Sequence, residues 1–98
     1  MIDRITKNEE RLDSILLSIK KLDDALKEFN NNKKNIILIN KYYGSKNWFK
    51  DKEAYETNKI EKIKAGVLGE DTVFDMNDDI GCLIHEMKKI INSYGKVN

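Results

Sequence analysis

Apolar residues recur at every seventh position along the first part of the chain. One series is Ile5, Leu12, Ile19 and Leu26, and a second, offset by three residues, is Ile15, Leu22, Phe29, Ile36 and Tyr43. A seven-residue repeat with two apolar positions keeps a stripe on one side of an α-helix, and another helix normally covers such a stripe. The pattern therefore predicts a long N-terminal helix over about residues 3–43, roughly 60 Å in length at 1.5 Å per residue.

Three asparagines at positions 30–32 are the place where this helix could break. Asparagine is a poor helix former because its side chain competes for backbone hydrogen bonds. Ile36 and Tyr43 keep the phase of the repeat beyond the asparagines, so we expect the helix to continue, with a break as the alternative. Asn40 falls on the stripe itself, where it could fix the register of a facing helix or point to solvent.

Glycines and capping residues divide the segment that follows. Gly44 is expected to end the long helix in the left-handed conformation, and Ser45 can cap a short turn or helix that carries Trp48. Asn58 and Glu61 have the spacing of a capping box, which predicts a short helix that ends near residue 66.

A second apolar stripe runs from Val73 to Tyr94 and predicts a last helix over about residues 70–94, ended by Gly95. The expected architecture is a single all-α domain spanning residues 1–98. It has a long first helix (about 3–43), an irregular connector with a short helix (about 44–68), and a last helix folded back antiparallel as a coiled-coil-like helical hairpin.

The two stripes differ in length. At 1.5 Å per residue the second one extends about 32 Å, so the last helix can cover the first only down to about Leu22. Five aliphatic residues are then left without a cover, and we call them the N-terminal stripe: Ile5, Leu12, Ile15, Leu16 and Ile19. An exposed patch of this kind is typical of an interface, which predicts a homodimer or a helical protein partner. In the alternative, a first helix broken at the asparagines folds into a compact monomeric bundle.

Composition narrows the class of protein. With 36% charged residues, 40% hydrophobic residues and no proline, the chain suits surface helices. The net charge of +1 argues against a dedicated nucleic-acid binder. No stretch approaches the roughly 20 apolar residues that span a bilayer, and the N-terminus lacks the apolar core of a signal peptide. Cys82 is the one cysteine, so no internal disulfide can form, and we expect a cytoplasmic protein.

Residue types that carry chemistry are few. Asp78, Cys82 and His85 share one face of the last helix and are acceptable zinc-ligand types, but the chain has no second cysteine or histidine to complete a structural site. The sequence also lacks a phosphate-binding glycine loop and a nucleophile elbow. We therefore expect no catalytic, cofactor or metal site, no small-molecule ligand and no enzyme activity.

The middle of the chain allows two further interpretations. Acidic residues near Trp48 and Tyr55 could line a polar pocket or hold a cation, although we expect Trp48 to close the end of the hairpin instead. Six lysines interleaved with aromatic residues could contact phosphates and stack bases, which gives a nucleic-acid accessory protein as the alternative function. These lysines are Lys33, Lys34, Lys41, Lys46, Lys50 and Lys52.

The same region resembles a known family. Tyr42-Tyr43-Gly44-Ser45, then Trp48, Asp51 and Glu53, and the segment AGVLGEDTVFD at 65–75 are similar to the pattern of the bacterial domain of unknown function 4298 family. Gly69 stands where that family usually has serine, and Phe74 where tyrosine is common. The resemblance implies an all-helical domain and brings no activity, substrate or cofactor.

From these residues we define a candidate structural or contact cluster in the connector, here called the connector cluster: Tyr42, Tyr43, Gly44, Trp48 and Asp51. The function that the sequence favours is a small cytoplasmic bacterial protein that acts as a non-catalytic protein–protein interaction or assembly module through its helix surfaces.

Overall fold

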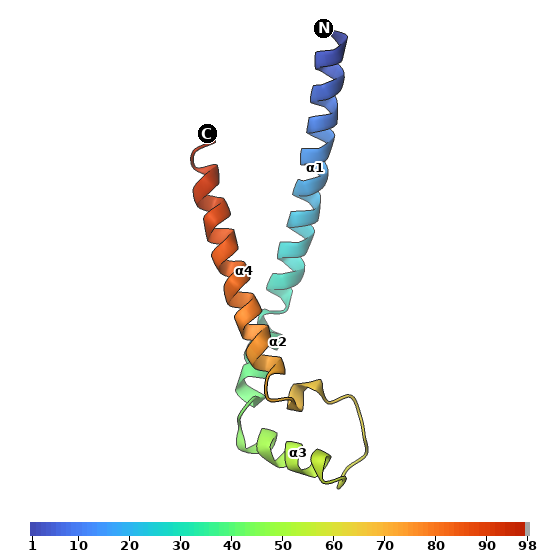
Figure 1. Cartoon of the computed structure of the whole chain (residues 1–98), viewed down its shortest axis with the longest axis vertical. Coiled ribbons are helices and arrows are strands. Elements are labelled where there is room, and N and C mark those ends of the chain that lie inside the picture. Colours follow the sequence, from blue (N-terminus) through green and yellow to red (C-terminus); the bar gives the residue numbers. More distant parts are fainter. Residues whose placement is uncertain (98) are drawn as a thin grey trace. The chain divides into compact units, whose positions relative to one another are not determined.

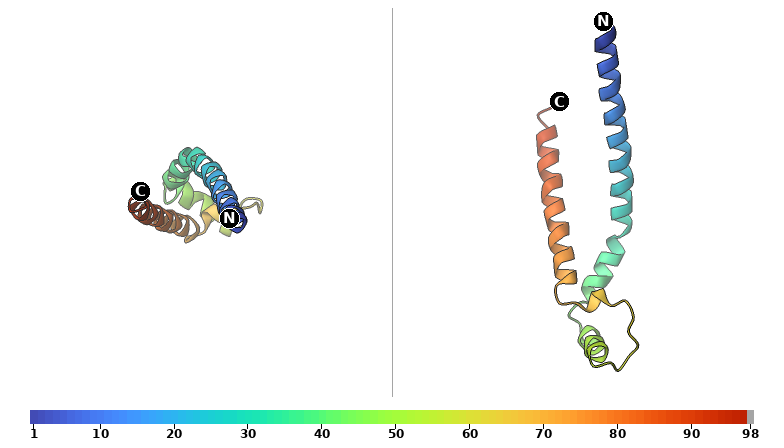
Figure 2. Two further views of the ribbon diagram at one scale, coloured as in Figure 1. Left: turned by 90° about the horizontal axis from the view of Figure 1, so that it is seen from above. Right: turned by 45° about the vertical axis from the view of Figure 1, so that its right-hand side comes forward.

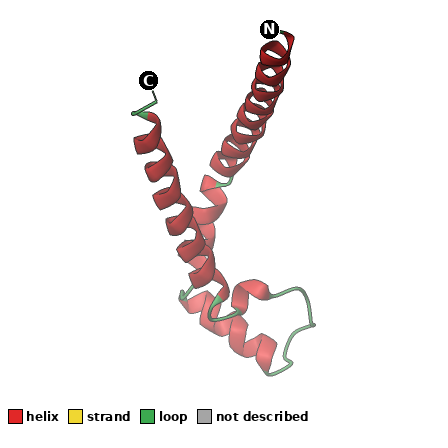
Figure 3. Ribbon diagram, turned by 45° about the horizontal axis from the view of Figure 1, so that its top comes forward, coloured by secondary structure: helices red, strands yellow, loops and turns green. Residues whose placement is uncertain are grey.

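The chain is all-α, as the sequence predicts. The computed structural model describes residues 1–97, and they contain no strand (Figures 1 and 3). The elements in chain order are α1 (Ile2–Asn31), α2 (Lys33–Tyr42), α3 (Lys46–Glu56), the 3₁₀ turn η1 (Gly66–Leu68) and α4 (Thr72–Tyr94). Within this range no helix is long and apolar enough to cross a membrane. The chain forms two compact units, residues 1–37 and the segment from Leu38 onward, which are described separately.

The first unit consists of α1 and the first turn of α2, and the helix does not run unbroken through the asparagines. Asn32 lies between the two helices with φ −85° and ψ −2°, where the ribbon is interrupted (Figure 2, right). Its backbone N–H bonds the Phe29 oxygen three residues back (3.0 Å) rather than that of Glu28. The Glu28 oxygen instead accepts a hydrogen bond from the side-chain amide of Asn32 (3.2 Å).

The prediction of a continuous helix over 3–43 is therefore wrong at one residue. The cause is the competition between asparagine side chains and the backbone that makes this residue type a poor helix former. The Ile36 N–H already bonds the Asn32 oxygen (2.9 Å), so helical bonding resumes at once in α2.

In the second unit, the turn between α2 and α3 follows the prediction. Gly44 adopts φ +75°, the left-handed conformation that glycine accepts without steric cost. Ser45 then caps α3, because its side-chain oxygen accepts a hydrogen bond from the Trp48 backbone N–H (3.2 Å).

The short helix expected from Asn58 to about residue 66 does not form. Asn58 has φ +59° and lies just after α3. Its N–H bonds the Tyr55 oxygen (3.3 Å), and the Lys59 N–H bonds the Ala54 oxygen (2.9 Å), which together make a Schellman motif. Asn58 thus ends a helix rather than starting one, and a loop follows it up to η1 (Figure 3).

The helix α4 begins at Thr72, two residues later than expected, and the turn η1 (Gly66–Leu68) precedes it. The helix ends at Tyr94, and Gly95 follows as predicted. The buried hydrophobic side chains among the described residues are Trp48, Leu68 and Val73. The core of the second unit therefore lies where α3, η1 and the start of α4 meet.

The end of α2 and the start of α4 run antiparallel, as expected for a hairpin. The Tyr43 hydroxyl donates a hydrogen bond to the Glu70 backbone oxygen. Asn40, which precedes Tyr43, pairs with Asn77, which follows Glu70. The partners thus advance along the chain in opposite directions. Each amide donates to the other, at 3.1 Å and 2.7 Å. Asn40 thus contacts a facing helix, the first of the two roles considered for it.

Candidate interaction surfaces

The N-terminal stripe lies entirely on α1 and is exposed. Its five side chains, Ile5, Leu12, Ile15, Leu16 and Ile19, have between 46% and 58% of their surface accessible. Helix α1 is 30 residues long and has no buried residue. Leu22, Leu26 and Phe29 continue the same apolar face and are exposed as well.

Local polar contacts support α1 as a helix without covering this face. The Asn8 side chain donates to the Arg4 backbone oxygen (2.8 Å) and accepts from the Arg11 guanidinium (3.0 Å). Lys20 pairs with Asp24 (3.3 Å) and Asp23 with Lys27 (2.9 Å), both four residues apart. Each such exposed pair contributes only about 0.3–0.5 kcal/mol to a helix. These local contacts therefore add little to the stability of α1 and leave its apolar face exposed.

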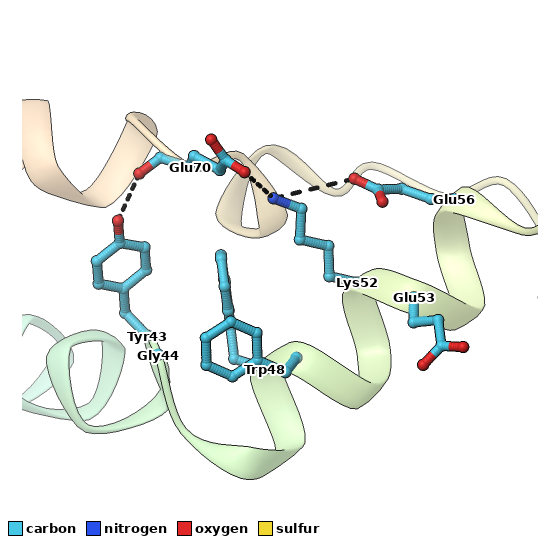
Figure 4. A pocket seen from close by; sticks show the side chains of 8 residues that line it. Tyr43, Gly44, Trp48, Lys52, Glu53, Glu56 and Glu70 are labelled. Atoms are coloured by element: carbon cyan, nitrogen blue, oxygen red, sulfur yellow. Dashed lines mark hydrogen bonds and ion pairs between the residues drawn. The ribbon is translucent and has the colours of Figure 1, made fainter.

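The connector cluster is centred on Trp48, which is 5% exposed. Its indole N–H donates to the Val67 backbone oxygen of η1 (2.9 Å). The Tyr43 ring meets the indole edge-on, with the ring centroids 5.2 Å apart, and the Tyr43 hydroxyl bonds the Glu70 backbone. Trp48 and Tyr43 thus tie α3 and the end of α2 to the segment that leads into α4 (Figure 4).

Tyr42 and Asp51 form a second contact of the cluster. The Tyr42 hydroxyl donates to a carboxylate oxygen of Asp51 (2.7 Å) and so joins α2 to α3 across the Gly44 turn. Burial raises the pKa of Tyr42 above its ordinary value of 10.0, and the hydrogen bond to Asp51 and the negative charge of Asp51 raise it further. The proton of this hydroxyl is therefore held more firmly than that of a free tyrosine.

Lys52 borders the connector cluster on the side of the segment that leads into α4. Its ammonium lies 3.1 Å from a carboxylate oxygen of Glu70 and 3.9 Å from one of Glu56, and 5.0 Å from the centroid of the Trp48 ring. These groups border an open hollow of about 660 Å³ (Figure 4). The hollow is lined by Tyr43, Gly44, Trp48, Phe49, Lys52, Glu53, Glu56 and Glu70. The lysine charge is already matched by carboxylates there, so the geometry supports a structural junction better than a binding site for a charged ligand.

Phe49 differs from Trp48, although the two are adjacent. Phe49 is 61% exposed, whereas Trp48 is 5% exposed. Its ring rests edge-on against Trp48, with centroids 4.9 Å apart. Because the two residues are consecutive on α3, they point in different directions, and only one can enter the core.

The candidate metal ligands lie where the sequence places them. Asp78, Cys82 and His85 border one open hollow on the side of α4, together with Asn77, Gly81 and Glu86. Within residues 1–97, no three side chains of His, Cys, Asp or Glu are grouped closely enough to hold a metal ion. Two of the acidic residues near Trp48 that could line a polar pocket or hold a cation have partners within the chain. Asp51 accepts a hydrogen bond from Tyr42, and Glu56 is paired with Lys52.

Comparison with known proteins identifies the family. The family described as a domain of unknown function (DUF4298) matches residues 5–90. The chain belongs to this family. No curated protein and no solved structure matches it. The match takes in both the N-terminal stripe and the connector cluster, so both surfaces are parts of the DUF4298 domain.

Several residues of these surfaces were missed by sequence reasoning. Val67 and Asn77 pair with residues 19 and 37 positions away in the chain, and nothing in their local pattern indicates those partners. Lys52 is one of the six lysines considered above as phosphate contacts, yet its side chain is only 17% exposed. Its position four residues after Trp48, on the same face of α3, was the signal that could have placed it.

Proposed function

We propose that this DUF4298 protein is a non-catalytic protein–protein interaction or assembly module of the cytoplasm, and that it binds its partner through the N-terminal stripe of α1. The observation that carries the proposal is the exposure of five aliphatic side chains, at heptad and flanking positions, on a helix with no buried residue. A helix with an apolar stripe is stable when that stripe is covered by another helix.

The two units have different roles in this proposal. The connector cluster is internally bonded, because its indole and its tyrosine hydroxyls have partners within the second unit. The neighbouring Lys52 is bonded there as well. The cluster is suited to hold α2, α3 and α4 together. The apolar face of α1, in contrast, is exposed and has no buried residue. Covering it with a partner would remove more apolar surface from water than covering the connector. We therefore assign binding to α1 and structural support to the connector.

The free energy that covering the N-terminal stripe would contribute is appropriate for an interface. Fully burying a leucine or isoleucine is worth roughly 1.5–3 kcal/mol, so covering five half-exposed side chains contributes on the order of 5 kcal/mol before the cost of association. A lone, exposed thiol at Cys82 suits a reducing compartment and supports the cytoplasmic assignment.

The experiment compares matched charge insertions on α1. Leu12→Glu combined with Ile19→Glu places two carboxylates in the stripe. Leu17→Glu is the control, because Leu17 is 55% exposed but lies on the opposite side of the helix. The wild type and both variants are tagged and used to capture partners from native cells. Each captured protein is then purified, and its affinity for all three is measured directly.

We expect a defined protein that binds the wild type and Leu17→Glu with equal affinity and binds the stripe variant at least tenfold more weakly. Circular dichroism of each variant checks that helix content is retained. Partners that bind the stripe variant as tightly as the wild type would show that α1 is not the binding surface.

A further inference from the structure

We propose that the N-terminal stripe is covered by a second copy of this chain, with the two α1 helices paired in parallel and in register as a coiled coil. The inference rests on the proposed function, since it uses the same surface, and it adds the identity and orientation of the occupant. It is carried by the arrangement of charges and of one asparagine along the exposed face of α1.

The apolar face of α1 has the layers of a two-stranded coiled coil. Ile5, Leu12, Ile19 and Leu26 occupy one core position of the heptad, and Ile15, Leu22 and Phe29 occupy the other. All seven are exposed in the structure. In a parallel pair in register, each of these residues meets its own counterpart, so every apolar layer is matched with an identical one.

Asn8 occupies the remaining core position and distinguishes the possible pairings. Pairing Asn8 with its own counterpart avoids displaced pairings, which would leave its amide against an apolar side chain at a cost in free energy. The Asn8 amide bonds Arg4 and Arg11 of its own helix. An amide has two N–H donors and two acceptor lone pairs, so it can also bond an amide of the partner. Reciprocal bonding of this kind is present between Asn40 and Asn77.

Charges beside the core favour the parallel orientation. In a parallel coiled coil, the residue before one core position lies beside the residue that follows the other core position on the partner helix. Arg4 precedes Ile5 and Glu9 follows Asn8, so a parallel pair places Arg4 beside Glu9 of the second copy, twice by symmetry.

The antiparallel pair that covers the same positions is disfavoured. It places Asn8 against Leu26 of the second copy and Glu9 near Asp23 of the second copy, again twice. The first contact leaves an amide facing an apolar side chain, and the second brings like charges together. The parallel pair thus has three favourable contacts, one between the two Asn8 side chains and two between Arg4 and Glu9. The antiparallel pair has four unfavourable contacts, two of each kind.

The extent of the surface is adequate for a dimer. From Ile5 to Phe29 the face is about 36 Å long at 1.5 Å per residue. Eight half-exposed residues on each helix, counting Leu16 at the flank, bury on the order of 1,300 Å², within the range of specific interfaces. Beyond Phe29 the next core position is Lys33, which would face its own counterpart. The helix interruption at Asn32 separates Lys33 from α1.

Two neighbouring glutamates provide the test. Glu9→Arg places the introduced guanidinium beside Arg4 of the second copy in the parallel dimer, but beside Asp23 of the second copy in the antiparallel one. Glu10→Arg makes the same change of charge one residue away, on the outer face of the helix. The dissociation constants of the wild type and of both variants are measured by sedimentation equilibrium of the full chain at low ionic strength, where surface charges are least screened.

We expect a wild-type dimer in the micromolar range, a roughly tenfold weaker dimer for Glu9→Arg, and less than a threefold change for Glu10→Arg. The exchange Arg4→Glu with Glu9→Arg should restore the wild-type affinity, which a merely misfolded Glu9→Arg could not do. A tighter dimer with Glu9→Arg, or equal effects of the two glutamate variants, would overturn the parallel arrangement. A wild type that stays monomeric at hundreds of micromolar would overturn self-association. In that case the proposed function is judged separately, by the binding of captured partners to the stripe variant.

Discussion

Trp48→Ala tests most directly whether the connector is a packed junction. The indole is 5% exposed, donates a hydrogen bond to the Val67 oxygen and contacts the rings of Tyr43 and Phe49. Removing a buried tryptophan side chain costs about 3–5 kcal/mol, mainly through the cavity that it leaves. About 1 kcal/mol of this is the hydrogen bond, and the Lys52 ammonium above the ring adds on the order of 0.5–1 kcal/mol.

Such a loss is large for a unit of this size. At about 0.05–0.15 kcal/mol per residue, the segment from Leu38 onward has a free energy of unfolding of about 3–9 kcal/mol. The substitution should therefore remove at least about a third of this free energy. We expect urea unfolding, followed by circular dichroism, to show a clearly lower midpoint or a chain whose second unit is unfolded without denaturant.

Phe49→Ala is the matched control. The ring of Phe49 is 61% exposed, so its removal should cost about 1 kcal/mol or less. In addition, the native emission of Trp48, the one tryptophan of the chain, should be shifted to the blue and should move to the red on unfolding. Water-like emission from the native protein, or equal destabilisation by the two alanine substitutions, would refute the packed junction.

Two further predictions concern the polar contacts of the second unit. The raised pKa of Tyr42 means that its contribution to stability is present below pH 10.0 and is lost as the pH rises through the higher folded-state pKa. Tyr42→Phe should therefore lessen the fall of stability above pH 10.0, as measured by urea unfolding at a series of pH values. At the amide pair, Asn40→Ala and Asn77→Ala should each cost about 0.5–1.5 kcal/mol. The double substitution should cost less than the sum of the two, and strict additivity would argue against the pair.

Much of the fold could be predicted because its determinants are local. The heptad repeat alone indicates α1, since period and phase are visible within the segment itself. The turn after α2 was predicted in the same way: Gly44 supplies the left-handed conformation and Ser45 caps the next helix. Both signals act over a few neighbouring residues and need no knowledge of the rest of the chain.

Predictions failed where one residue type serves two opposite purposes. Asn58 and Glu61 have the spacing of a capping box, but asparagine is also one of the few residues that tolerate the left-handed conformation at a helix end. Asn58 ends α3 rather than starting a new helix, because the last carbonyls of α3 accept hydrogen bonds from the Asn58 and Lys59 N–H groups. The sequence of α3 has no clean apolar period because the helix buries one residue, Trp48, so its end was not recognised.

The interruption at Asn32 divides one heptad repeat between two helices, α1 and α2. The phase of the heptad continues through Ile36 and Tyr43, which is why an unbroken helix was expected. The asparagine side chain that diverts a backbone hydrogen bond, however, separates two helices with different surroundings. On the far side, Asn40 of α2 is bonded to α4, and Tyr43 just after it to Glu70. On the near side, α1 buries nothing within its own chain segment. The asparagine run therefore marks the point where the repeat changes from residues bonded to α4 and its approach to an apolar face that is exposed along α1.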